Sequence, residues 1–139
     1  MTVILDTNVI MDGLQERQPF DEEAKEILLR AQNAEFVCYF TAKAATDIFY
    51  FYNKARDLKS ARQVLGFLLA TYKIVSVTHE DCVNAIDIPI DDFEDALVSV
   101  CARKVEADYI ISRDEKFLED DSPVKVIAPK AFLQILVGK

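Results

Sequence analysis

The fold is decided by the N-terminal stretch TVILDTN at residues 2–8. The apolar run at residues 3–5 is short and uninterrupted, which predicts a buried strand. Asp6 follows directly, and aspartate is one of the residues that most often cap the first turn of a helix. The stretch therefore predicts a buried strand with an acidic residue at its carboxyl end.

Strands and helices are expected to alternate along the rest of the chain. Apolar runs predict further strands at residues 36–40, 73–77, 109–112 and 124–127. Capped or amphipathic stretches predict helices at residues 20–33, 41–56, 57–72 and 91–106, with others starting near residues 78 and 129. Because alternating strands and helices form a parallel sheet covered on both faces, we expect an α/β/α sandwich with about five strands. One domain over residues 1–139 accommodates these elements. The helix at residues 91–106 is expected to bury Phe93, Ala96, Leu97, Val100 and Cys101.

The composition excludes several classes of protein. A hydrophobic content of 51% excludes a disordered chain, and no apolar run approaches the roughly 20 residues that a membrane span needs. No signal peptide precedes the first strand, so a cytoplasmic protein is expected. Cys38, Cys82 and Cys101 lack the spacing of metal ligands and are interpreted as reduced core residues. The one histidine, His79, is interpreted as a surface residue.

The net charge of −8 argues against a broad electrostatic surface for nucleic acid, which normally requires a surplus of lysine and arginine. It is compatible with a nuclease whose acidic pocket is neutralised by cations. The densest basic cluster is expected where two helices meet, and we interpret it as an RNA-binding patch or as a solvated helix junction. It consists of Lys54, Arg56, Lys59 and Arg62.

Four aspartates are expected to meet at one edge of the sheet. Asp6 and Asp114 each follow a strand, and Asp95 lies in the first turns of the helix that leads into the strand at residues 109–112. Asp47 reaches the same edge if its helix packs close to the first strand. Ligands of open parallel sheets bind beyond the carboxyl ends of the strands, so this edge is the candidate site.

Carboxylates that crowd together repel one another, and hard divalent cations relieve that repulsion. Mg²⁺ or Mn²⁺ held by aspartates could activate water to attack a phosphodiester. Each acid also has an ordinary alternative role: Asp6 as a helix cap, Asp114 as a turn residue and Asp95 as a partner of the helix dipole. Among the neighbouring acids, Asp92 is expected as an auxiliary ligand, and Asp91 and Glu94 are interpreted as solvated surface residues.

Three acidic motifs resemble those of the PIN-domain family. They are LDTNV at residues 5–9, FEDAL at residues 93–97 and ISRDEKF at residues 111–117, and APKAFL at residues 128–133 resembles the family's last helix. The resemblance covers the whole chain and implies a metal-dependent ribonuclease. It further implies that Asp6, Asp95 and Asp114 bind Mg²⁺ or Mn²⁺, with Asn8 and Ser112 as polar supports.

The segment AATDI at residues 44–48 departs from the family pattern. The family usually has a glutamate where this chain has Asp47, and the shorter side chain leaves the role of Asp47 open between holding a metal through water and changing the preferred cation. Asp47 completes the expected catalytic set. Small proteins of this type are commonly toxins of type II toxin–antitoxin pairs, so the resemblance also implies an antitoxin partner.

Two further features bear on partners and activity. The apolar clusters at residues 50–52 and 67–69 provide surface for a homodimer or a docking groove, or else pack into the core. The alternatives to a ribonuclease are a non-catalytic or RNA-processing PIN-like module and a haloacid-dehalogenase-like phosphatase with Asp6 as nucleophile. A phosphatase of that kind requires a second acid two residues after the first, where this chain has Asn8.

Overall fold

A parallel sheet of five strands forms the centre of the protein. The computed structural model describes residues 1–138, and its strands lie in the order β3-β2-β1-β4-β5. Every pair of neighbouring strands is parallel. The strands are β1 (Thr2–Leu5), β2 (Val37–Thr41), β3 (Lys73–Val75), β4 (Tyr109–Ile111) and β5 (Val126–Ile127). The expected five-stranded parallel sheet is confirmed.

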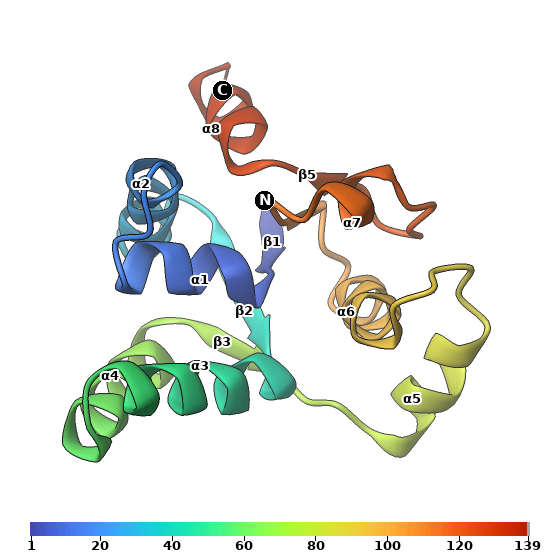
Figure 1. Ribbon diagram of the computed structural model, residues 1–139. Helices are drawn as coiled ribbons and strands as arrows, with labels where there is room; N and C mark the ends of the chain where they lie inside the picture. The colour runs from blue at the N-terminus through green and yellow to red at the C-terminus, as the bar shows by residue number, and fades with distance from the viewer. Residues whose placement is uncertain (139) are drawn as a thin grey trace.

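Helices cover both faces of the sheet, as Figure 1 shows. One face packs against α1 (Thr7–Leu14), α2 (Asp21–Gln32), α3 (Ala42–Ala55), α4 (Leu58–Thr71) and α8 (Pro129–Val137). The other face packs against α5 (His79–Ile86), α6 (Phe93–Lys104) and α7 (Glu115–Glu119). The three-layer α/β/α architecture therefore follows the sequence-based expectation.

Alternation along the strands divides the core into two clusters. In β1, Val3 and Leu5 belong to the cluster beneath α1 and α2, and Ile4 belongs to the cluster beneath α6. Ile110 and Ile111 of β4 divide between the two clusters in the same way. Successive side chains of a strand point to opposite faces, so a strand that is covered on both sides is apolar throughout.

Local sequence explains where most helices begin. Asp6, Thr41, Asp57 and Asp92 each accept a hydrogen bond from a backbone N–H at the start of the helix that follows. Thr78 forms a reciprocal capping box with Asp81 at the start of α5. These side chains satisfy N–H groups that have no partner within the helix. Asp6 therefore caps α1, which is the alternative role considered for it above. It also lies at the carboxyl edge of the sheet.

Three details differ from the expectations. Strands β3, β4 and β5 are shorter than predicted: residues 76–77, 112 and 124–125 lie outside them. The short helix α7 follows Asp114 where no helix was predicted. Phe93, the first residue of α6, is 48% exposed and belongs to neither core cluster. The other four residues that this helix was expected to bury are buried.

The composition-based interpretations of single residues agree with the structure. Cys38 and Cys101 are buried, Cys82 is partly buried, and all three are free thiols. His79 is exposed. Within residues 1–138, no helix combines the length and the apolar character that crossing a membrane demands.

The strand order creates a crevice at the carboxyl edge of the sheet. The chain moves outward from β1 through β2 to β3 on one side, then returns to place β4 and β5 on the other side of β1. The segments that leave β1 and β4 therefore diverge. Such a switch point is where open parallel sheets characteristically bind ligands.

Candidate active site

The register of β1 and β4 places Asp6 beside Ser112. Leu5 pairs with Ile111, and the Asp6 backbone N–H donates to the Ile111 carbonyl at 2.9 Å. The Ser112 hydroxyl then donates to Asp6 Oδ2 at 2.8 Å, and both residues are buried. Two residues 106 positions apart in the chain are thus joined because their strands are neighbours.

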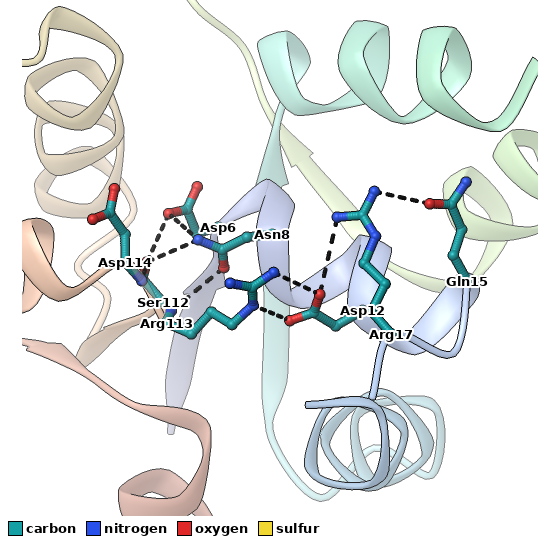
Figure 2. Close-up of polar contacts among 8 residues, drawn as sticks. All are labelled: Asp6, Asn8, Asp12, Gln15, Arg17, Ser112, Arg113 and Asp114. Carbon is teal, nitrogen blue, oxygen red and sulfur yellow. Dashed lines mark hydrogen bonds and ion pairs between the residues drawn. The ribbon is translucent and has the colours of Figure 1, made fainter. Parts of the chain in front are cut away.

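Asn8 connects this pair to the segment that follows β4, as Figure 2 shows. Its Nδ2 lies 3.3 Å from Asp6 Oδ2 and 3.3 Å from Ser112 Oγ, and its Oδ1 accepts from the Arg113 backbone N–H at 3.4 Å. Ser112 Oγ also accepts from the Asp114 backbone N–H at 3.1 Å. These bonds hold the loop that carries Asp114 against the end of β1.

Acids from both helical layers line one pocket with these residues. Asp47 comes from α3 on one face of the sheet, and Asp95 comes from α6 on the other. The full set of acids in the pocket is Asp6, Asp47, Asp92, Glu94, Asp95 and Asp114. The structure therefore brings together all four aspartates of the expected catalytic set and the expected auxiliary Asp92.

Burial, together with the crowding of negative charge, raises the pKa of several of these acids. Burial, followed by the charges of Asp92, Asp6, Asp114 and Glu94, raises the pKa of Asp95 to about 7. Burial also raises the pKa of Asp6, although its bonds to Ser112 and to the Thr7 backbone act in the opposite direction. Carboxylates with raised pKa values in a pocket are typical of a functional site.

The pocket fits a hard divalent cation in its chemistry and its charge. The acids that line the pocket offer carboxylate oxygens, which Mg²⁺ and Mn²⁺ prefer as ligands. A bound cation would offset the repulsion that contributes to the raised pKa of Asp95. Across residues 1–138, however, no three His, Cys, Asp or Glu side chains are grouped closely enough to hold one metal ion. The carboxylates share a pocket but remain apart.

Two basic residues that the sequence analysis did not assign to the site also line the pocket. Lys43 Nζ lies 2.7 Å from each oxygen of Asp47 and 3.9 Å from Glu94 Oε2. Arg17 lines the pocket as well, and its NH2 donates to Gln15 Oε1 at 2.8 Å. Glu94 was interpreted as a solvated surface residue; its side chain is 44% exposed, and it also lines this pocket. Asp91, in contrast, is exposed as expected.

Asp12 is a second residue that the sequence analysis missed. It is 1% exposed in α1 and pairs with the Arg113 guanidinium, whose NH2 lies 3.1 Å from Asp12 Oδ1. The same guanidinium lies over the Phe20 ring, 4.2 Å from its centroid. Arg113 stands between Ser112 and Asp114, so this ion pair fastens α1 to the loop of the site (Figure 2). The sequence did contain a signal for Asp12, which is an acidic residue within the apolar segment of its helix.

The predicted basic cluster does not line the acidic pocket. Arg56 lines a separate hollow near the end of α3, and its guanidinium lies 5.9 Å from the Tyr52 ring centroid. Lys54, Lys59 and Arg62 are exposed at the junction of α3 and α4. In the apolar clusters, Leu68 is buried in the core, whereas Tyr50, Phe51, Phe67 and Leu69 are exposed.

The fold and the pocket together define a class of parallel α/β domain with an acidic site at the switch point. A family model described as PIN domain matches residues 2–116. The chain therefore belongs to the PIN domain family, and the resemblance of its three acidic motifs is confirmed at the level of the family. No curated protein matches the sequence.

Solved structures confirm the fold at low sequence identity. A chain of the VapBC2 crystal structure from Rickettsia felis, bound to a DNA fragment from its promoter, is 14% identical with a TM-score of 0.71, over 92% of this chain and 98% of that chain. Neisseria gonorrhoeae FitAcB is 18% identical with a TM-score of 0.68, over 92% and 98% of the two chains. Mycobacterium tuberculosis VapC20, described as a Sarcin-Ricin loop cleaving toxin, is 16% identical with a TM-score of 0.66, over 83% and 92%.

Replacing Asp12 should destabilise the protein. Removal of one partner of a fully buried ion pair costs about 3–5 kcal/mol, and we expect about 2–3 kcal/mol for Asp12→Ala because Arg113 is partly exposed. The free energy of unfolding is measured by urea titration. Glu26→Ala serves as the control, since its pair with Arg30 is a surface pair between neighbouring helical turns worth less than about 1 kcal/mol. Equal losses in the two variants would contradict a fastening role for Asp12.

Replacing Asp95 with asparagine should stabilise the metal-free protein at alkaline pH. The folded protein keeps the Asp95 proton up to about pH 7, whereas the unfolded chain, with the ordinary pKa of 3.8, releases it earlier. The stability due to this proton is therefore complete below about pH 4 and is lost as the pH rises through 7.

We expect Asp95→Asn to exceed the wild type by about 1–2 kcal/mol at pH 8 in a chelator, and to match it near pH 4. This value is reduced from a full conversion of the pKa change because the carboxylate faces an open pocket. Urea unfolding at both pH values provides the measurement, with exposed Asp91→Asn as the control. A wild type as stable as Asp95→Asn at pH 8 would contradict the inferred crowding.

Proposed function

We propose that this chain is a divalent-metal-dependent endoribonuclease that hydrolyses RNA phosphodiester bonds, with residues 1–139 acting as one domain. The observation that carries the proposal is the pocket itself. Acids from the ends of β1 and β4 and from helices on both faces of the sheet line it, and their mutual repulsion contributes to an Asp95 pKa of about 7. Membership of the PIN domain family is consistent with this function.

In this proposal Asp6, Asp95 and Asp114 hold Mg²⁺ or Mn²⁺. A divalent cation supplies a water of lowered pKa and stabilises negative charge on the phosphodiester. Ser112 and Asn8 orient Asp6 through the hydrogen bonds described above, and Asp92 supports the start of α6 by accepting from the Asp95 backbone N–H at 3.1 Å. Because the acids stand apart in the structure, binding of a cation requires side chains to rotate toward it.

Asp47 completes the proposed catalytic set through Lys43. Both Asp47 oxygens accept from Lys43 Nζ, so this carboxylate holds an ammonium group at the pocket. We propose that Lys43 and Arg17, which line the pocket, contact phosphates of the RNA near the cleaved bond. The cluster of Lys54, Arg56, Lys59 and Arg62 remains a prediction for a more distant part of the RNA.

We further propose that the protein is the cytoplasmic toxin of a type II toxin–antitoxin pair. Among the structures with the same fold are a toxin-antitoxin complex from Klebsiella pneumoniae and the VapBC structure from Salmonella typhimurium bound to DNA. An antitoxin protein is the proposed partner. The exposed apolar side chains Tyr50, Phe67 and Leu69 support a protein interface and, with it, the homodimer that the sequence analysis anticipated.

Two observations favour a second candidate function, a non-catalytic module of the same fold. Both oxygens of Asp47 are occupied by Lys43, and within residues 1–138 no three acidic groups are spaced for a single metal ion. Calorimetric titration with Mn²⁺ separates the two functions. Heat that fits a defined site supports the nuclease, and its absence at millimolar Mn²⁺ supports the module.

Asp6→Asn tests the nuclease directly. The variant keeps the shape of the side chain and loses the charge proposed to hold the cation, so the rate of Mg²⁺- or Mn²⁺-dependent cleavage of total RNA should fall at least about 100-fold. Gel electrophoresis of the products measures the rate, and thermal unfolding verifies that the variant folds.

Asp91→Asn is the matched control, because Asp91 is exposed near the same helix and contacts only Lys116, at 3.6 Å, among the ion pairs of residues 1–138. This control should cleave at the wild-type rate. Full activity in folded Asp6→Asn protein would remove the assignment of the site.

A further inference from the structure

Helix α3 presents a row of three unlike side chains to the acidic pocket. Lys43, Asp47 and Phe51 are spaced four residues apart, which places them on the same side of a helix, and all three line the pocket. The neighbouring row, Ala44 and Ile48, is buried against the sheet. The row therefore runs from an ammonium group through a carboxylate to an aromatic ring along one wall of the site.

Phe51 lines the pocket but does not contribute to the hydrophobic core. The residue is 43% exposed and belongs to neither of the two core clusters. The Tyr50 ring meets it at an edge, with centroids 5.3 Å apart and planes inclined at 74°. A phenyl ring does not ligate Mg²⁺ or form a hydrogen bond to a phosphate, and it offers an apolar planar surface beside the six acids of the pocket.

The pocket combines this ring with groups suited to phosphate. Lys43 and Arg17 provide positive charge, and the acids provide the proposed cation site. Proteins that bind single-stranded nucleic acid combine cationic groups along the backbone with aromatic rings on which bases stack. A protein partner could also cover the phenyl ring, but it would have no need of the cations and acids that surround the ring here.

We propose that Phe51 stacks on a base of the RNA next to the cleaved bond, and that the nucleotide carrying this base is unpaired. The proposal rests on the ribonuclease function proposed above and assigns the recognition of a base to one residue of α3. The base must be unpaired because both of its faces are covered by neighbouring bases inside a duplex, and A-form RNA offers no groove through which the ring could reach them. The RNA is therefore a single strand, a loop or a bulge at the cleavage site.

The test compares Phe51→Ala with Tyr50→Ala. Both replace an exposed aromatic residue of α3, but only Phe51 lines the pocket. The probe is a fluorescein-labelled single-stranded RNA of random sequence, with Ca²⁺ in place of Mg²⁺ to slow hydrolysis, and anisotropy gives the Kd. A fully paired duplex of similar length is the second probe. Thermal unfolding verifies that each variant is folded.

Phe51→Ala should raise the Kd for the single strand about tenfold, the loss expected for one stacked base. Phe51→Trp should restore binding, Tyr50→Ala should stay within about twofold of the wild type, and the duplex should be insensitive to Phe51. An equal effect of Phe51→Ala on single strand and duplex overturns the proposal, as does an effect no larger than that of Tyr50→Ala.

Three other outcomes distinguish a failure of this proposal from a failure of the proposed ribonuclease function. If the wild type cleaves RNA with Mg²⁺ while Phe51→Ala binds the single strand normally, base stacking fails and the nuclease function stands. If Phe51→Ala also abolishes self-association in analytical ultracentrifugation, the ring belongs to a protein interface. If the wild type cleaves no RNA, the proposed function fails, and the inference fails with it.

Discussion

Electrostatic repulsion among carboxylates at the carboxyl edge of the sheet is the constraint on which the rest of the structure depends. Asp6 and Asp95 are both buried at this edge, and each lies within the field of Asp92 and Asp114. Burying several carboxylates close together costs free energy, because burial and repulsion both favour the protonated acid. Their convergence is understandable if a cation or a cationic ligand completes the site.

The fold maintains this arrangement by supporting each acid from a different element. The β1–β4 register fixes Asp6 beside Ser112, and the buried Asp12 holds Arg113 and, with it, the segment that leads to Asp114. Asp95 is held by the first turn of α6, whose apolar side belongs to the core beneath the sheet. Loss of one support should therefore displace one acid without dispersing the others.

The sequence was sufficient to predict features encoded in short stretches. The apolar run before Asp6 and the helix that starts near Asp95 are local patterns, and parallel topology then places both at one edge. Lys43, Arg17 and Glu94 could not be assigned to the pocket, because their positions depend on how the segment after α1 and the helices α3 and α6 lie against the sheet. Asp12 required its partner Arg113, 101 residues away, to be known. Phe93 was wrongly expected to be buried, because apolar periodicity does not reveal which residue at the start of a helix lies outside the core.

The most direct measurement of the central claim is anomalous diffraction from crystals soaked in Mn²⁺. The account predicts an anomalous peak within coordination distance of carboxylate oxygens of Asp6, Asp95 and Asp114, about 2.0–2.4 Å for a hard divalent cation. The side chains should lie closer together there than they do in this structure. A well-diffracting soak with Mn²⁺ bound elsewhere and none between these three acids would contradict the account.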